Sequence, residues 1–194
     1  MRNIFFIAAG VFVAATVAGG GYYLLSHGLP AQNGAAVAAA TAATSSPAAP
    51  RPVPARCGQS DGAVCVEYRN DKYHFSVFYS DQKEEHEFDE GGGASTITFE
   101  NFNNGHGWQL FVVPYGEPQV TPARFKEDDP SGVRTDVQNV TVDGATGAAF
   151  YSYDARLGDT YEVWFIHGNY LYELTTLKPL APQMQERLAT WEWL

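Results

Sequence analysis

Residues 159–176, DTYEVWFIHGNYLYELTT, constrain the fold more than any other part of the chain, because they combine aromatic and β-branched side chains with two glutamates. Such a composition is typical of β-strands, in which successive side chains point to opposite faces. Gly168-Asn169 divides the run, and such a pair is typical of a two-residue turn between antiparallel strands. The run therefore predicts a β-hairpin with a fixed register, because a slip of one residue would exchange its two faces.

The predicted register gives the hairpin one apolar face and one mixed face. The apolar face is expected in the core and consists of Tyr161, Val163, Phe165, His167, Tyr170, Tyr172 and Leu174. On the mixed face, Glu162 lies opposite Thr175 and Glu173 lies opposite Trp164. The two glutamates are thus diagonal neighbours, roughly 7–8 Å apart at the backbone. We expect them to form a polar rim on a face that a helix covers only in part.

Strand patterns recur through the preceding part of the chain. They cover residues 63–68, 73–80, 95–101, 108–115, 136–142 and 145–154. Asp143-Gly144 predicts a tight turn between the last two of these strands. One helix is predicted to begin at Pro122 with Thr121 as its cap, and another spans residues 181–191. Mostly consecutive strands with few helices predict an α+β fold, an antiparallel β-sheet flanked by helices.

Charge is distributed unevenly along the 194 residues, whose net charge is −10. The first 56 residues contain three arginines and no acidic residue, which leaves nine basic and 22 acidic residues, a net charge of −13, in residues 57–194. This region is long enough for one domain with its own core. Its acidity disfavours nucleic acid as a partner, because phosphates would be repelled.

The N-terminal region predicts a membrane attachment followed by a spacer. Residues 4–25 carry no charged side chain and, as a helix, would extend roughly 33 Å, enough to cross a bilayer core. We interpret residues 1–25 as a membrane anchor, with a long cleaved signal peptide as the alternative. The Ala/Pro-rich residues 26–56 are expected to be a disordered linker. Arg2 on the N-terminal side places the domain at 57–194 outside the cytoplasmic membrane, in the periplasm or at the cell surface.

The order of several segments resembles the PsbP family of extrinsic photosystem subunits and its bacterial relatives. The segments are KYHFSVFYS, WQLFVVPY, VTVDGATGAAFYSYDA, TYEVWFIHGNYLYELTT and the closing ATWEWL. The resemblance covers about residues 67–194. It implies an α/β/α sandwich, in which helical layers enclose an antiparallel sheet, and a binding or assembly role rather than catalysis. Tyr79-Ser80-Asp81 departs from the proline-containing pattern of the family, and a photosynthetic role is not implied.

The acidic run at 81–90 is a candidate cation site. Glu84, Glu85, His86 and Glu87 are its candidate ligands, since hard cations prefer several carboxylates and members of the resembled family have been linked to calcium or manganese. The run lacks the spaced pattern of a calcium loop, so a solvated loop is expected and no metal is assigned. The chain contains no G-x-S-x-G, phosphate loop or dinucleotide motif, and no cofactor or catalytic residue is assigned.

A catalytic role for the hairpin glutamates is the least favoured interpretation. The expected separation of Glu162 and Glu173 falls within the range of inverting glycosidases, roughly 6.5–9.5 Å. A general acid, however, needs a closed and partly apolar cleft that raises its pKa, and a flat hairpin face normally offers none. Lys178 and Arg187, on or near the last helix, are the expected ion-pair partners of the two carboxylates.

Three functions therefore remain open at the level of sequence. The first is a non-catalytic, membrane-anchored domain outside the cytoplasm that docks on a protein or a cell-envelope component. The second is a carbohydrate- or small-ligand-binding module that uses surface aromatic residues. The third is a small glycoside hydrolase. The side chains expected to contact a ligand or partner are Trp108, Trp164, Glu162 and Glu173.

Cys57 and Cys65 are the only cysteines, and outside the cytoplasm such a pair is expected to form a disulfide. Protein taken from its native compartment should take up no thiol-blocking reagent before reduction and should take it up at both cysteines afterwards, measured as intact mass. The closed loop is short, so its loss should cost roughly 2–3 kcal/mol and leave the main sheet folded. Two blocked thiols before reduction would contradict the pairing.

Overall fold

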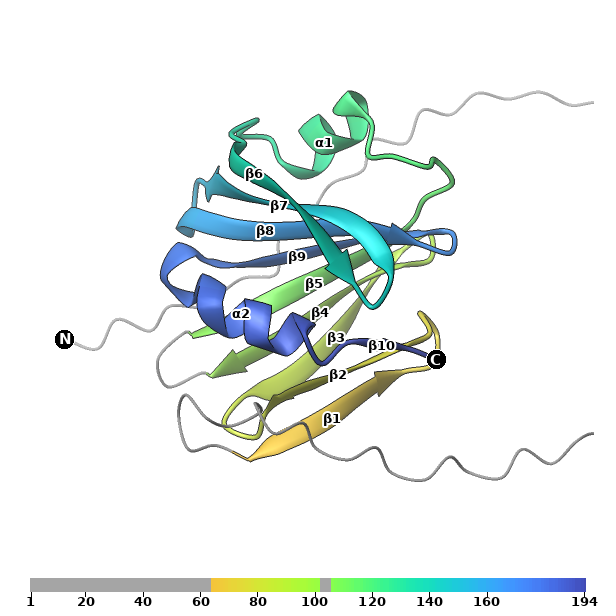
Figure 1. Cartoon of the computed structure of the whole chain (residues 1–194), viewed down its shortest axis with the longest axis vertical. Helices are drawn as coiled ribbons and strands as arrows, with labels where there is room; N and C mark the ends of the chain where they lie inside the picture. The colour runs from red at the N-terminus through yellow and green to blue at the C-terminus, as the bar shows by residue number, and fades with distance from the viewer. Residues whose placement is uncertain (1–63, 102–105) are drawn as a thin grey trace, which may run out of the picture. The chain divides into compact units, whose positions relative to one another are not determined.

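The computed structural model describes residues 64–101 and 106–194, which fold into two antiparallel sheets with few helices (Figure 1). The larger sheet has the order β3-β4-β5-β9-β8-β7-β6. Its strands are β3 (Glu84–Gly91), β4 (Ala94–Asn101), β5 (His106–Pro114), β6 (Thr135–Val142), β7 (Ala145–Asp154), β8 (Gly158–His167) and β9 (Tyr170–Leu177). The smaller sheet, β1-β2-β10, contains β1 (Cys65–Asn70), β2 (Phe75–Ser80) and β10 (Glu192–Trp193). The helices are α1 (Pro122–Asp128), the 3-10 turn η1 (Lys178–Leu180) and α2 (Ala181–Leu188).

The β8–β9 hairpin has the predicted register and lies near the middle of the larger sheet. Glu162 is opposite Thr175, and Trp164 is opposite Glu173. On the face predicted to be apolar, five side chains are buried: Tyr161, Val163, Phe165, Tyr172 and Leu174. Phe165 stacks on Tyr172 with ring centroids 5.3 Å apart. The prediction of a core position is wrong for His167, which is exposed beside the turn, and Tyr170 is half-buried. Local alternation and the turn were therefore sufficient to predict this pairing.

The apolar face of the large sheet packs against the small sheet and α2. Phe75 of β2 stacks on Trp191 at 4.2 Å and meets the edge of Tyr172 at 6.2 Å. Met184 of α2 is 1% exposed and belongs to the same core. The α+β class and the antiparallel sheet are confirmed. The cover on this side, however, is a second sheet together with a helix, and not the helical layer of the expected α/β/α sandwich.

The opposite face of the large sheet is covered by α1 over strands β7, β8 and β9. Phe125 of α1 contacts Phe150 and Trp164, with ring centroids 5.7 and 5.3 Å away. The helix begins where the sequence predicted, because the hydroxyl of Thr121 accepts a hydrogen bond from the backbone N–H of Arg124 at 3.2 Å. This face is the mixed face of the hairpin, so α1 and not the last helix lies over the two glutamates.

Two predicted elements differ from the structure. The acidic residues 81–90 were expected to form a loop, but Glu84–Gly91 is an edge strand that pairs with β4. Backbone pairing with an apolar neighbour outweighed its polarity, and charged side chains are common on edge strands. The last helix ends at Leu188, three residues early. Beyond it, the hydroxyl of Thr190 accepts a hydrogen bond from the N–H of Phe78, which draws the chain toward β2.

The predicted anchor at 4–25, the linker at 26–56 and Cys57 lie outside the described residues. Cys65 is described and is buried at the start of β1, but its disulfide to Cys57 stays a prediction. In the two described ranges, no helix is long and apolar enough to span a membrane. Attachment through 4–25 and a location outside the cytoplasm therefore also stay predictions.

Replacing Gly147 in β7 should destabilise the domain strongly. A Cβ atom there would lie 2.3 Å from the carbonyl oxygen of Trp164 and 2.6 Å from the Cβ of Phe165, so β7 and β8 would have to separate. We expect Gly147→Ala to lower the free energy of unfolding by about 1–3 kcal/mol in urea titrations. Gly116→Ala is the matched control, since a Cβ at Gly116 meets no atom within 4 Å. Equal stability of the two variants would contradict the close packing at Gly147.

Candidate functional site

Four carboxylates are enclosed between α1, the residue that follows it, and the large sheet. We call Asp128, Asp129, Glu162 and Glu173 the sub-helix carboxylates. The residues Asp129, Glu162 and Glu173 are 9%, 7% and 6% exposed, and the side chain of Asp128 is 9% exposed. Buried carboxylates are uncommon unless they are paired or protonated, so this group is the most unusual chemical feature of the described domain.

Glu162, on β8, accepts hydrogen bonds at one carboxyl oxygen. The hydroxyl of Thr175 donates to Oε2 at 2.6 Å, and the indole N–H of Trp164 donates to the same oxygen at 3.3 Å. Burial nevertheless raises the pKa of Glu162 from 4.5 to about 7, and the nearby charge of Asp129 acts in the same direction. Desolvation thus outweighs the two donors, and Glu162 is partly protonated near neutral pH.

Glu173, on β9, lies beside Asp128 at the end of α1. Burial raises the pKa of Glu173 well above its usual value, and the hydrogen bond and charge of Asp128 raise it further, whereas Arg124 opposes the shift. Oε1 of Glu173 is buried and has no hydrogen-bond partner. Two adjacent anions in a dry site repel each other, so the neighbouring charge of Asp128 favours the protonated form of Glu173.

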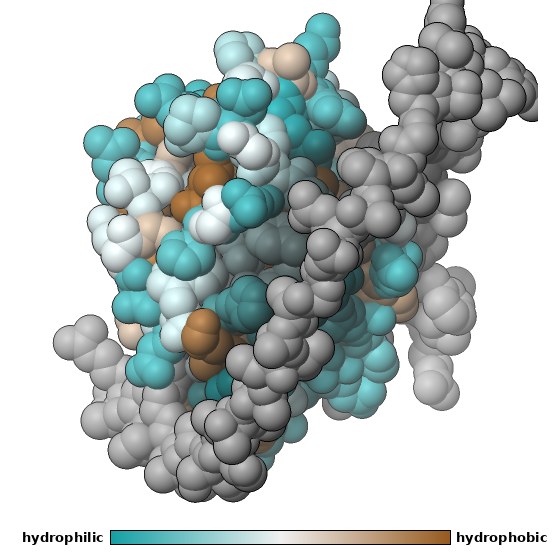
Figure 2. Space-filling view, turned by 90° about the vertical axis from the view of Figure 1, so that its right-hand side faces the viewer, coloured by the Kyte–Doolittle hydropathy of each residue, from teal (hydrophilic) through white to brown (hydrophobic). Residues whose placement is uncertain are grey.

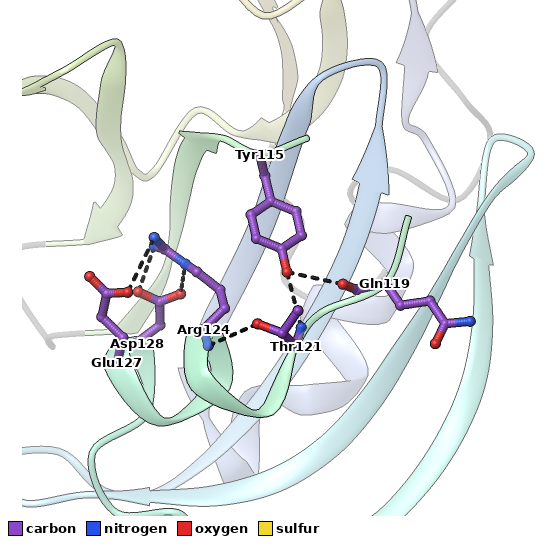
Figure 3. Close-up of polar contacts among 6 residues, drawn as sticks. All are labelled: Tyr115, Gln119, Thr121, Arg124, Glu127 and Asp128. Atoms are coloured by element: carbon purple, nitrogen blue, oxygen red, sulfur yellow. Dashed lines mark hydrogen bonds and ion pairs between the residues drawn. The ribbon is translucent and has the colours of Figure 1, made fainter. Parts of the chain in front are cut away.

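Arg124 is the cation that balances Asp128. Its Nη2 donates to Oδ1 of Asp128 at 2.6 Å, and its Nε donates to Oδ2, which makes a two-point contact along one turn of α1 (Figure 3). Glu127, which is exposed, lies 3.7 Å from the same guanidinium. Figure 3 also shows Tyr115, whose hydroxyl donates to the carbonyl of Gln119 and accepts from the N–H of Thr121. These bonds fix the segment that enters α1.

Asp129 is held by hydroxyl groups and not by a cation. The Ser152 hydroxyl donates to Oδ2, and the Ser131 hydroxyl donates to Oδ1 at 2.6 Å. Ser152 lies on β7, so Asp129 connects the end of α1 to the sheet. Together with the contacts of Phe125, this bond determines how α1 lies over the glutamates.

The prediction of a polar rim at the glutamates is wrong, because α1 buries both of them. Their expected partners lie elsewhere. Lys178 pairs with Asp159 at 3.7 Å, and Nη1 of Arg187 is 3.3 Å from the sulfur of Cys65. The diagonal placement of Glu162 and Glu173 agrees with the predicted register.

The two tryptophans expected at the surface are both buried. Trp108 is 5% exposed and stacks on Phe99 at 4.0 Å, on the core face of β5. Trp164 is also 5% exposed and lies under Phe125. Neither side chain offers an open face on which a sugar ring could stack.

The candidate cation ligands at 84–87 belong to β3, where successive side chains point to opposite faces. Glu84 and His86 lie on one face, and Glu85 and Glu87 lie on the other. Glu87 accepts a hydrogen bond from the hydroxyl of Tyr68 at 3.1 Å. Among the described residues, no group of three or more His, Cys, Asp or Glu side chains is arranged to hold a metal ion.

Sequence reasoning missed the contribution of Arg124, Asp128 and Asp129. The spacing of Arg124 and Asp128 by four residues predicts an ion pair on one face of the predicted helix. Nothing in the local pattern indicated that this face would lie against the hairpin, because that contact joins segments far apart in the chain. The sub-helix carboxylates are thus a product of tertiary structure.

No family model matches the chain, and no curated protein matches it. The solution structure of PsbP (CyanoP) from the cyanobacterium Synechocystis sp. PCC 6803 has a TM-score of 0.49 and 10% sequence identity, and the match covers 71% of this chain and 97% of that one. Membership of the PsbP family stays a prediction.

The stability of the domain should fall as the pH rises through neutrality. The pKa of Glu162 is about 7 in the folded chain and 4.5 ordinarily, so the folded state binds the proton more tightly. Its stabilisation is complete below about pH 4.5 and is lost as the pH rises to about 7, on the order of 3 kcal/mol. Urea unfolding from about pH 5 to about pH 8 measures this loss.

Glu162→Gln should weaken this pH dependence, because glutamine cannot ionise. Glu90→Gln, on the exposed edge strand β3, is the matched control and should keep the dependence of the wild type. A Glu162→Gln variant that loses as much stability as the wild type over the same pH range would contradict the assignment.

Proposed function

We propose that residues 57–194 are a non-catalytic binding domain that docks on a protein or another cell-envelope component. In this proposal, residues 4–25 hold the chain to the cytoplasmic membrane and 26–56 space the domain from it. The uncharged run at 4–25 and the Ala/Pro-rich composition of 26–56 support this arrangement. The resemblance to PsbP proteins, over about residues 67–194, supports the binding role.

An exposed apolar patch is the observation that carries the docking role. Four large apolar side chains are 40–49% exposed at one end of strands β6, β7 and β8. We call them the β6–β8 end patch: Val133, Val137, Tyr153 and Leu157. Among the described residues, the other exposed large apolar side chains are Val64, Val66, Phe88 and Leu194. Grouped exposed apolar residues are typical of interaction sites, whereas scattered ones are ordinary.

The strand register brings Val133, Tyr153 and Leu157 to one end of the sheet, and Val137 lies in the irregular stretch of β6 between Thr135 and Gln138. Thr135 pairs with Tyr151, so Val133 and Tyr153, two residues beyond each, extend in the same direction. Tyr153 pairs with Asp159, and Leu157 lies in the turn between them. On a different side of the domain, shown in Figure 2, hydrophobic areas are small and separated by hydrophilic residues.

The edge of the large sheet adds to this surface. β6 is the last strand at its end of the sheet, so one row of its backbone groups has no neighbouring strand in the sheet. From Val137 to Val142 it carries no charged side chain, unlike β3 at the other edge. An extended segment of a partner could therefore pair with β6 while contacting the patch.

The environment of the carboxylates favours binding over hydrolysis. Glu162 and Glu173 have raised pKa values, as a general acid requires, but they lie beneath α1 and form internal hydrogen bonds. A depression near Trp108 and Met184 has a volume of about 10 Å³, room for roughly one water molecule. A glycosidic substrate needs an open cleft in contact with both carboxyl groups.

Site-specific photo-crosslinking tests the docking role in membranes that contain the full-length chain. A photoreactive phenylalanine analogue at Tyr153 should give a crosslinked product of discrete mass, because this side chain lies in the patch. The same analogue at Val66, on β1, is the control and should give little product, although Val66 is 39% exposed. Equal crosslinking from both positions, or none from either, would contradict the patch as the docking surface.

A further inference from the structure

We propose that α1 is a proton-controlled cover: when Glu162 and Glu173 lose their protons, α1 leaves the sheet and exposes the apolar surface formed by Phe150 and Trp164. This inference concerns a different part of the domain from the docking patch and does not depend on the proposed function. It rests on the charged groups that are enclosed beneath α1 and on the contacts that hold α1 to the sheet.

The charges around the two glutamates are predominantly negative. Arg124 and Asp128 of α1, with Glu127 at its exposed side, face them from above, and Asp129 faces them from the end of the helix. Arg134, before β6, lies over the rings of Phe125 and Phe150 at 5.4 and 5.0 Å. The neighbouring strands contribute uncharged side chains, since Phe111 is opposite Glu173 and Phe150 is opposite Glu162.

Protonation of Glu162 and Glu173 stabilises the packing of α1 over them. The carboxyl group of Glu173 lies beside that of Asp128, and its Oε1 is buried without a hydrogen-bond partner. If the proton of Glu173 passes to solvent, two carboxylates remain in contact, and the guanidinium of Arg124 is already engaged by Asp128. Glu162 adds another negative charge to the same dry layer as it ionises. Buried like charges of this kind are strongly unfavourable, and the structure can relieve their repulsion by admitting water.

α1 is the element that can move away from the sheet. It has only seven residues, and the side chain of Asp128 is enclosed although no residue of the helix is buried as a whole, whereas β8 and β9 are hydrogen-bonded on both sides within the sheet. An isolated helix of this length is marginal in water, so its order depends on its contacts with the sheet. The bonds of Tyr115 to Gln119 and Thr121 hold the entering segment (Figure 3). Departure of α1 at its other end requires the hydrogen bond from Ser152 to Asp129 to break.

Departure of α1 would change the surface of the domain. Phe150 is 1% exposed and Trp164 is 5% exposed while Phe125 covers them. Without α1, both rings and the two charged glutamates would face solvent together. An acidic and aromatic surface would thus be present at high pH and covered at low pH.

Hydrogen–deuterium exchange of the full-length chain tests the inference. The N–H of Phe125 bonds to the carbonyl of Thr121, and the N–H of Asp129 bonds to the carbonyl of Phe125, so both report on α1. After correction for intrinsic exchange, their protection should fall by about tenfold or more between about pH 5 and about pH 9, while amides of β8 and β9 stay protected.

The double variant Glu162→Gln, Glu173→Gln should keep α1 protected at both pH values, because its side chains cannot ionise. Glu117→Gln, in the exposed segment before α1, is the matched control and should behave as the wild type. Unchanged protection of α1 in the wild type, or an equal loss in the double variant, would overturn the proposal.

If the double variant does not fold, a second measurement on the wild type tests whether ionisation of the two glutamates accompanies the opening of α1. The carboxyl carbon resonances of Glu162 and Glu173 report ionisation directly in isotope-labelled protein. The proposal requires the loss of α1 protection to follow the same pH midpoint as these resonances. Opening of α1 at a pH where neither carboxyl group titrates would overturn it.

Discussion

The pairing of β8 with β9 across Gly168-Asn169 determines where every other layer of the domain can lie. It places Phe165, Tyr172 and Leu174 on one face, and Glu162, Trp164 and Glu173 on the other. The apolar face is stable only when another apolar layer excludes water from it, and the small sheet and α2 form that layer. The mixed face needs a cover that can accommodate carboxyl groups, and α1 provides it with Arg124, Phe125 and Asp128.

The elements that the sequence predicted correctly are those specified by neighbouring residues. The hairpin register depends on alternation and a two-residue turn, and the start of α1 depends on Thr121 followed by Pro122. The errors arose where distant segments meet. Glu84–Gly91 is a strand because β4 lies beside it, and Trp191 leaves the helix because it stacks on Phe75.

In the candidate site, too, neighbouring residues specify one part of the arrangement and contacts between distant segments specify the rest. The register alone indicated that Glu162 and Glu173 are diagonal neighbours. Whether they are exposed depends on which helix covers them, and no local pattern identifies it. A carboxyl group at the rim and one beneath α1 have the same sequence context but very different chemistry, since burial raises the pKa of Glu162 to about 7. Burial of charge is thus a property that only tertiary structure reveals.

The two edges of the large sheet differ in charge, because β3 is acidic whereas β6 is uncharged from Val137 to Val142, and this difference affects how molecules of the protein associate. At the β3 edge, carboxylates on both faces repel the same edge of another molecule, so that side resists association as long as its charges are felt. At roughly 1 M salt the range of such repulsion shrinks to about 3 Å. Concentrated solutions should therefore aggregate less at low ionic strength than at high ionic strength. A protein whose molecules attract one another through opposite charges shows the reverse dependence on salt.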